Sequence, residues 1–447
     1  MDAENVRAAF ITPIFSPETA GPPVLIARAL QHAGFDTAVL TTVPNYPLGR
    51  TFPGYSSWKP VTETSAGFRV ARAPVFPSHD SAVFRRFGTY GSFAASASAI
   101  GHGMLLTADV ALVYATQITA ALPAMIARYS GGPPYVLMIQ DLWPDSIFAT
   151  GFLDRGPARK LTQIGLGGFA QAAYAGAEHI IVIAPGMRDR LVERGVPASR
   201  ISVIYNWADE AVTRPMAPTG RLRSQLGLAS DDFLFLYAGN HGYAQRLDTW
   251  VNAMSQVEDL KRVHLVLMGQ GSEREGLARL VAERGLPNVH LLEAVPREEV
   301  SEISADADAL VISLADEPLF QITLPGKTQA SLALGKPIVA SGAGDLRRVI
   351  EKSGAGWVVP PESPDAVARA IRLALTESSE GLANRGLSGL SFYRRCMSQA
   401  IGEQAISEVL RAALRPQGGH QLRPSVGPGR GLHRYRVNGR HRGTLWR

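Results

Sequence analysis

Short apolar segments recur along the chain and alternate with amphipathic segments of helical period. Runs of aliphatic and β-branched residues predict buried strands at 6–11, 37–42, 68–75, 109–115, 135–140, 179–184 and 201–205. Between most of them, apolar residues lie three or four positions apart, as in PVLIARALQHAG at 23–34, and this spacing predicts helices. Such alternation is typical of a parallel sheet covered by helices on both faces.

The pattern lapses after Asn206 and then restarts. Residues 207–231 are irregular, and strands are expected at 233–238, 263–268, 289–292, 310–314, 337–340 and 357–359. Helices are expected near 246–257, 272–285, 297–305, 326–334, 345–353 and 363–376. We therefore predict an α/β protein with two doubly wound, Rossmann-like domains that face each other across a cleft, a common place for a site with two substrates.

The length supports this division, because 447 residues are too many for one hydrophobic core. The expected parts are an N-terminal domain, a linker, a C-terminal domain, a C-terminal helix and a basic disordered tail, at 1–206, 207–231, 232–392, 393–415 and 416–447.

The tail accounts for the basic character of the chain. Residues 416–447 contain seven arginines and no acidic residue, so the remainder has 38 basic against 39 acidic residues and a net charge of −1. The tail is rich in Gly, Pro and Arg, and its composition predicts disorder. It is either a contact for polyanions such as nucleic acid or anionic lipid, or an inert extension, which we favour.

Composition narrows the class of protein. A hydrophobic fraction of 46%, a charged fraction of 19% and the lack of any segment of about 18 uninterrupted apolar residues argue against a polytopic membrane protein. The single Cys396 excludes an internal disulfide and a multi-cysteine metal site, and the N-terminus does not resemble a secretory leader. We expect a cytoplasmic protein.

The segment at 316–341 offers an anion site. Pro325-Gly326-Lys327 opens a helix between two buried strands, where free backbone N–H groups and the Lys327 ammonium favour a phosphate or diphosphate. The alternative is a plain helix start with a solvated lysine.

Other polar residues follow predicted strands. Asp141 and Asp145, in DLWPDS, come after the strand at 135–140, where ligands of such sheets bind, although Asp145 fits a turn or helix-capping role better. Gly269 and Gly271 stand where backbone must approach a ribose or base, which is a weak signal by itself. Glu273 is either a hydroxyl acceptor or a first-turn helix carboxylate. The proline-rich loop at 43–60 is a candidate acceptor wall.

With both halves placed, the chain resembles the retaining glycosyltransferases of family 4, which have the GT-B fold, over roughly residues 5–415. The resemblance rests on the order and spacing of PETAGPP, QDLWPDS, IAPGMRDRLVERGVPASRISVIYNWADE, YAGNHGYAQRLDTW, MGQGSEREGL and PLFQITLPGKTQASLALGKPIVASGAGD. The nearest subgroup is the WbuB-type transferases of cell-surface polysaccharide assembly.

The chain departs from the family at several positions. The two glutamates of the E-x7-E motif would fall at Ile322 and Ala330, and the family's Arg and Lys for the donor diphosphate fall at Asn240 and Gln245. The histidine of the N-terminal domain falls near Tyr114. We therefore expect Lys327 to carry more of the phosphate charge, with Asn240 and Gln245 as neutral donors.

The resemblance implies a function. The N-terminal domain would bind the acceptor and the C-terminal domain a nucleotide sugar, with UDP favoured over GDP or TDP and with no metal or other cofactor. The acceptor would be a saccharide, in our interpretation linked to polyprenyl pyrophosphate, with no specific nucleic-acid partner. Asp141 and Lys327 would be the catalytic residues. The expected donor-binding residues are Gly21, Gly239, Asn240, Gln245, Gly269, Gly271, Glu273, Val295, Leu324, Pro325, Gly326, Lys327 and Gln329.

A further expectation concerns the acceptor side. The helix at 81–93 carries an aromatic stripe flanked by Arg85 and Arg86, and with His79 and Asp80 it is a candidate contact for an anionic membrane or acceptor. Alternatively, the stripe packs against the sheet. A soluble acceptor, a nucleotide-sugar epimerase or hydrolase, and a non-catalytic nucleotide-sugar sensor remain as rival functions.

Overall fold

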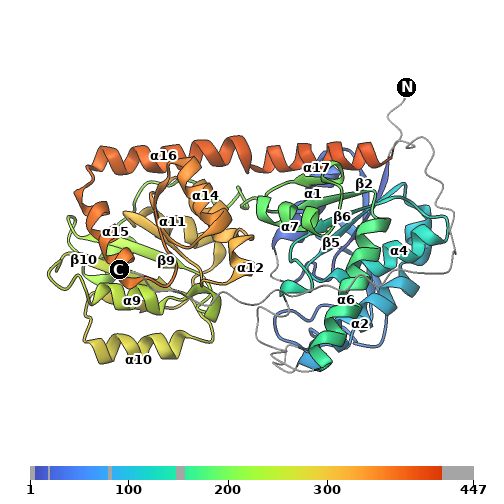
Figure 1. Ribbon diagram of the computed structural model, residues 1–447, viewed down its shortest axis with the longest axis horizontal. Helices are drawn as coiled ribbons and strands as arrows, with labels where there is room; N and C mark the ends of the chain where they lie inside the picture. Colours follow the sequence, from blue (N-terminus) through green and yellow to red (C-terminus); the bar gives the residue numbers. More distant parts are fainter. Residues whose placement is uncertain (1–5, 19–20, 79–82, 147–156, 415–447) are drawn as a thin grey trace, which may run out of the picture. The chain divides into compact units, whose positions relative to one another are not determined.

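Two parallel-stranded sheets organise the chain. The structure is a computed structural model, and it describes residues 6–18, 21–78, 83–146 and 157–414, without the side chains of 83–86, 157–159 and 161. The strand order is β3-β4-β2-β1-β5-β6-β7-β8 in the first sheet and β11-β10-β9-β12-β13-β14 in the second (Figure 1). The predicted fold class, with two doubly wound α/β domains, is confirmed, whereas the exact domain boundaries stay a prediction.

The predicted strands are all present within two residues of their expected bounds. The first sheet contains β1 (Arg7–Ile11), β2 (Asp36–Thr42), β3 (Val61–Ser65), β4 (Phe68–Ala73), β5 (Val110–Ala115), β6 (Tyr135–Ile139), β7 (His179–Val182) and β8 (Ile201–Val203). The second contains β9 (Phe233–Ala238), β10 (Val263–Met268), β11 (Val289–Leu292), β12 (Ala309–Ser313), β13 (Ile338–Ser341) and β14 (Gly356–Val359). Every residue of β5, β6 and β12 is buried, as expected for strands with helices on both faces.

Helices connect the strands and cover the sheets. Around the first sheet lie α1 (Gly21–His32), α2 (Val83–Ile100), α3 (His102–Thr107), α4 (Leu122–Tyr129), α6 (Pro157–Gly176) and α7 (Pro185–Glu193). The second half has α8 (Arg221–Leu226), α9 (Asp248–Met254), α10 (Arg274–Arg284), α11 (Val300–Ala305), α12 (Pro318–Gln321), α13 (Gly326–Ala333), α14 (Gly344–Ser353) and α15 (Pro364–Thr376). The chain continues in α16 (Ser379–Cys396) and α17 (Gln399–Ala413).

One strand was not predicted. Strand β3 pairs antiparallel with β4 at the edge of the first sheet, and its sequence VTETS has no apolar run because none of its residues is buried. The two strands are joined by Ala66 and Gly67, both with positive φ (53° and 88°), the geometry of a tight hairpin turn. The first sheet is therefore mixed rather than wholly parallel.

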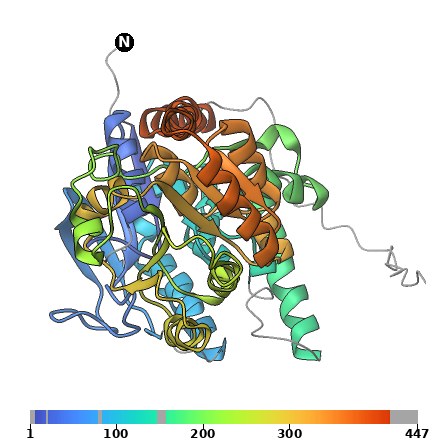
Figure 2. The same cartoon turned by 90° about the vertical axis from the view of Figure 1, so that its left-hand side faces the viewer.

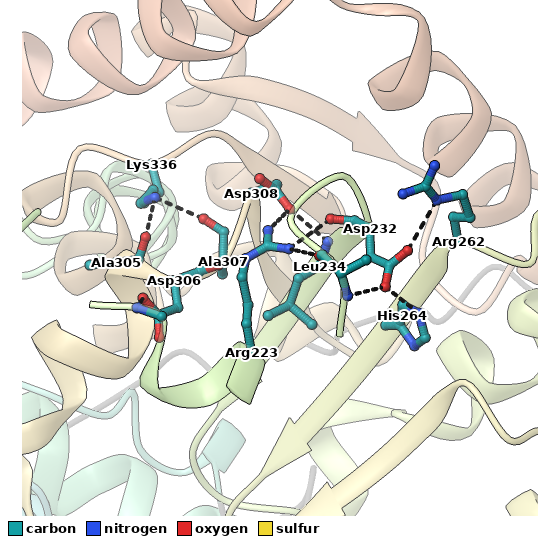
Figure 3. Close-up of polar contacts among 12 residues, drawn as sticks. Arg223, Asp232, Leu234, Arg262, His264, Ala305, Asp306, Ala307, Asp308 and Lys336 are labelled. Atoms are coloured by element: carbon teal, nitrogen blue, oxygen red, sulfur yellow. Dashed lines mark hydrogen bonds and ion pairs between the residues drawn. The ribbon is translucent and has the colours of Figure 1, made fainter. Parts of the chain in front are cut away.

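The linker is more ordered than its sequence indicated. Residues 207–231 include helix α8, whose first turn is capped by the buried Asp306 carboxylate, the acceptor for the backbone N–H groups of Thr219, Gly220 and Leu222 at 2.8 Å each. Arg223 of α8 donates to Asp308 at 2.5 Å (Figure 3). The second half of the linker is thus fastened to the second sheet.

The chain ends in two successive long helices that serve different sheets. Helix α16 packs against α13 and α14 of the second half, whereas α17 packs against α1, β5 and β6 of the first (Figure 1; Figure 2). Ile406 and Leu410 of α17 are fully buried, and Arg411 donates to the carbonyl of Ala33 at 2.7 Å. The C-terminal helix expected at 393–415 corresponds to α17, which begins later, at Gln399, whereas the last residues of α16, which begins at Ser379, occupy the start of that range.

Candidate functional site

Two loops meet at the carboxyl edge of the second sheet. The loop after β9 and the loop after β10 are joined by backbone hydrogen bonds from Gly239 N to Met268 O (2.8 Å), from His241 N to Gln270 O (2.7 Å) and from Glu273 N to His241 O (2.9 Å). Their shapes are therefore coupled, and ligands of open α/β sheets bind at this edge.

Three predicted glycines make this contact possible. Gly239, Gly269 and Gly271 have φ of 139°, 150° and 154°, which side chains rarely adopt. A Cβ at Gly269 would collide with the carbonyl oxygen of Gly239, and one at Gly271 with the carbonyl oxygen of His241. A Cβ at Gly239 would collide with the ammonium of Lys327. Glycine is therefore required at these three positions because other atoms of the protein come too close to leave room for a Cβ.

Lys327 reaches this loop pair from helix α13. Its Nζ donates to Ala238 O at 2.9 Å and lies 4.0 Å from the centroid of the Tyr237 ring, a cation–π contact. Burial lowers the pKa of Lys327 to about 7, and no carboxylate is among the groups that shift it. An anion in this place would favour the charged form of the lysine.

The other residues of the predicted helix start have local roles. The backbone N–H of Thr328 donates to Pro325 O at 2.8 Å. The amide of Gln329, oriented to satisfy its neighbours, donates to Pro325 O at 2.8 Å and to Gly326 O at 3.2 Å. Leu324 is buried and Gly326 is exposed, so within this group Gly326 and Lys327 remain the residues open to a ligand.

Asn240 and Gln245 bond to each other rather than standing free. The Gln245 Oε1 accepts from Asn240 Nδ2 at 3.3 Å and from the backbone of Gly242 at 3.1 Å. The two amides therefore hold the loop after β9 in shape, and their expected contact with a diphosphate stays a prediction.

Glu273 and Val295 lie on neighbouring loops. Glu273 immediately precedes α10 and lines a cavity of about 340 Å³ with Gly242 and Tyr243. Val295, after β11, packs against an apolar cluster that includes Met268. The sequence-predicted donor residues after β9, β10 and β11 and at the start of α13 therefore come together at one edge of the second sheet.

Asp141 follows β6 at the edge of the first sheet. It lines a cavity of about 270 Å³ together with Thr42, Tyr90, Thr116 and Gln117. Its side chain reaches solvent, yet the surrounding protein removes enough hydration to raise the pKa of Asp141 to about 6. A carboxylate of this kind is suited to accepting hydrogen bonds from a bound hydroxyl.

Asp145 has a structural partner. Its carboxylate pairs with Arg194, which also donates to Trp143 O at 3.0 Å. This contact ties the DLWPDS segment to the end of α7 and agrees with the turn role that the sequence favoured for Asp145.

Gly21 is the first residue of α1, and the Arg297 guanidinium lies so close that a Cβ at Gly21 would collide with it. The same Arg297 forms an ion pair with Asp209 at 3.7 Å. A cation thus lies beside the N-terminus of α1, and a phosphate contact of Gly21 stays a prediction.

The expected membrane-facing stripe on α2 packs inward over its described part. Phe93, Ala94 and Ala97 are buried, and the rings of Phe87 and Tyr90 lie 6.5 and 5.3 Å from that of Trp143. Phe93 therefore belongs to the core, and the expected membrane contact of the helix at 81–93 stays a prediction. His79 and Asp80 and the side chains of Arg85 and Arg86 lie outside the described residues. No helix within the described ranges is long and apolar enough to cross a bilayer.

Two buried residues were not predicted. Glu18 accepts hydrogen bonds from the backbone N–H groups of Phe15 (3.0 Å), Asn45 (2.8 Å) and Tyr46 (2.7 Å), and so fixes the loops around the Asp141 cavity. Burial raises the pKa of this carboxyl. His241 is fully buried between the two glycine loops. Both lie in segments that carry the family resemblance, PETAGPP and YAGNHGYAQRLDTW, but their individual roles were not predicted because each depends on contacts between loops.

The sequence matches two family models. Residues 24–207 match the model described as "Glycosyl transferase 4-like domain" and residues 232–377 match "Glycosyl transferases group 1". Together the two matches include both sheets except β1 at the start.

Several known proteins are similar over most of the chain. The putative colanic acid biosynthesis glycosyl transferase WcaI of Escherichia coli is 26% identical over 76% of this chain and 84% of its own length. The probable glycosyltransferase WbjE of Pseudomonas aeruginosa is 26% identical over 65% of this chain and 70% of its own.

Solved structures share the fold. Sucrose-phosphate synthase from Thermosynechococcus elongatus superposes with a TM-score of 0.70 at 18% identity, covering 91% of this chain and 98% of its own. HepE of Anabaena, solved in complex with UDP, has a TM-score of 0.66 at 15% identity, covering 91% of this chain and 100% of its own. The two domain matches show that the chain belongs to the family-4-like glycosyltransferases, and these structures show that it has the GT-B fold.

Proposed function

We propose that this chain is a retaining glycosyltransferase that moves a sugar from a nucleoside diphosphate, UDP by preference, to a saccharide acceptor in cell-surface glycan assembly. The names of the relatives WcaI and of LpsD of Rhizobium meliloti, a lipopolysaccharide core glycosyltransferase, support the pathway class. HepE, solved with UDP and with UDP-glucose, supports the nucleotide. The acceptor that fits this class is a saccharide carried on polyprenyl pyrophosphate.

One observation carries the proposal. Lys327 lies partly buried at the carboxyl edge of the second sheet, its pKa is lowered to about 7, and it sits beside the glycine-bearing loops after β9 and β10. A lysine in such a place binds an anion more strongly than a solvated lysine does, because less water screens the interaction. The N–H groups at the start of α13 add partial positive charge toward the same anion.

The chemistry follows from that charge. As the bond between the sugar and the diphosphate breaks, negative charge grows on the leaving phosphate, and Lys327 and the α13 N–H groups stabilise it. The acceptor hydroxyl attacks the face from which the diphosphate departs and passes its proton to a leaving-phosphate oxygen. Asp141, from the first sheet, accepts a hydrogen bond from the acceptor and holds it in place.

The proposal is tested by incubating the protein with UDP-, GDP- and TDP-sugars, with and without a polyprenyl-pyrophosphate saccharide, and with EDTA in a parallel series. Nucleoside diphosphate release that requires the lipid-linked acceptor and persists in EDTA is expected, and NMR of the product should show the donor's anomeric configuration. Release without acceptor would indicate a hydrolase or epimerase. Binding without release under every condition would indicate a nucleotide-sugar sensor.

A further inference from the structure

His241 is a buried side chain with no assigned task. Its side chain is fully buried, and among the described residues neither Nδ1 nor Nε2 forms a hydrogen bond of regular geometry. The backbone of Met268 is the nearest polar group to act on the ring, and its carbonyl already accepts from Gly239 N at 2.8 Å. An unsatisfied buried polar group destabilises the folded protein, so an imidazole in this state is a candidate for a hydrogen bond to a bound ligand.

The backbone on both sides holds the ring at the predicted donor site. The N–H and carbonyl of His241 are both bonded to the loop after β10, at 2.7 and 2.9 Å. A Cβ added at Gly269 would lie 3.2 Å from Nε2, so the glycine loop covers this nitrogen directly.

The imidazole ring also lies near Lys327, with the Tyr237 ring as their common neighbour. Its centroid lies 5.8 Å from that of Tyr237, whose ring carries Lys327 Nζ at 4.0 Å. Arg274, at the start of α10, donates to Gly269 O at 3.0 Å and to Leu292 O at 2.9 Å, and it pairs with Glu293 at 2.7 Å. Burial first, then Arg274 and Lys327, lower the pKa of His241 to about 4, and the nearby Met268 backbone and then Glu293 oppose them. The imidazole is therefore neutral at pH 7 and keeps one N–H donor.

We propose that His241 is a donor-binding residue, whose imidazole N–H donates a hydrogen bond to an oxygen of the bound nucleoside diphosphate when the loop at 269–271 shifts from its nitrogen. The inference rests on the proposed function, since it needs a nucleoside diphosphate at this edge of the sheet. In the family, an Arg and a Lys bind the diphosphate, and this chain has the uncharged Asn240 and Gln245 at those positions. A neutral imidazole N–H would give the diphosphate one additional hydrogen bond.

The test compares UDP affinity by calorimetry in the parent, His241→Phe and His241→Gln. Phenylalanine keeps the ring volume but has no donor, so UDP should bind about tenfold more weakly, the equivalent of one hydrogen bond to a charged acceptor. Glutamine places an amide N–H near the former Nε2 and should recover part of the loss. His290→Phe is the matched control: His290 lies in the same domain, bonded to His264 at 3.2 Å, and the variant should bind UDP like the parent.

NMR of the unmutated protein supplies an independent readout. In ¹⁵N spectra, the imidazole signal of His241 should shift on UDP addition, whereas those of His264 and His290 should not. His241→Phe with parental UDP affinity, together with an unmoved His241 signal, would overturn the inference and leave the proposed function intact. A parent protein that binds none of UDP, GDP and TDP would overturn both.

Discussion

At the scale of single residues, Lys327 makes donor binding depend on pH. Its pKa of about 7 means that the lysine loses its charge as the pH rises through 7. Since the anion binds the charged form better, UDP affinity should be highest below pH 7 and fall by up to about tenfold per pH unit between 7 and 9, until the raised pKa of the complex is reached.

Lys327→Met isolates this effect. The variant keeps the length of the side chain but removes the charge, so UDP affinity should drop by roughly 2 kcal/mol at pH 7 and lose its dependence on pH between 7 and 9. Calorimetry at three pH values checks this. An unchanged affinity would place the diphosphate elsewhere. The melting temperature should not fall, because the variant no longer holds a partly desolvated charge.

Gly239 should be as important as the lysine beside it. In Gly239→Ala the new Cβ would occupy the position of Lys327 Nζ at an unfavourable φ of 139°, so the lysine must move and UDP binding should weaken at least tenfold. Gly165→Ala, in α6 beside the first sheet, is the control, since a Cβ there meets no atom within 4 Å. Equal UDP affinities of the two variants would contradict a role for Gly239 in donor binding.

Asp141 should act on the acceptor and not on the donor. Its pKa of about 6 means that the carboxylate becomes protonated as the pH falls through 6, and transfer should decline there while UDP binding persists. Asp141→Asn should lower kcat and flatten this limb of the pH profile. Because folding raises this pKa, the ionised carboxylate disfavours the folded state above pH 6, so the variant should melt no lower than the parent at pH 8. Loss of UDP binding in the variant would refute the assignment.

At the scale of elements, α17 completes the core of the first sheet. Ile406→Ala removes a fully buried side chain from its inner face and should lower the free energy of unfolding by about 2–5 kcal/mol. Ile401→Ala, on the same helix, removes a side chain that is 40% exposed and should have a much smaller effect. Urea denaturation measures both, and similar losses would mean that α17 does not contribute through burial.

Some elements and site residues could be predicted from the sequence, and others could not. Buried parallel strands such as β5 and β12 have continuous apolar runs, so all of them were expected near their true bounds. The edge strand β3 was missed because its partly exposed residues are polar, and α8 because six residues are too few to show a helical period. Lys327 was predicted from its place at a helix start, Gly269 and Gly271 from their place at a strand end, and Gly239 from the family resemblance. His241 and Glu18 were not, since loop contacts alone give them their roles.

At the scale of the whole molecule, two short segments restrain the passage from the first sheet to the second. Glu210 accepts hydrogen bonds from Tyr393 Oη at 2.9 Å and from Gln399 N at 2.7 Å, so the crossover after β8 is tied to the junction of α16 and α17. Asp306 holds the start of α8. Two connections join the sheets, the segment after β8 and the junction of α16 and α17. Because they are bonded to each other, a change in the angle between the sheets must move both connections together.

The basic tail should be dispensable for catalysis. Residues 416–447 lie outside the described part of the chain, and their charge is the reason for the net charge of +6. Removing them should leave the melting temperature and transfer rate unchanged and remove any salt-sensitive affinity for heparin, a generic polyanion. A truncated protein that fails to fold would show that the tail belongs to the core.

The return of α17 to the first sheet also sets an order of events during synthesis. The last strand of that sheet ends at Val203, but the apolar surface over β5 and β6 is covered only when Ile406 and Leu410 have been made. At roughly 5–20 residues per second, the ribosome needs on the order of tens of seconds to reach them. During this interval we expect the nascent N-terminal half to expose an open hydrophobic face, to which a chaperone at the ribosome exit could bind.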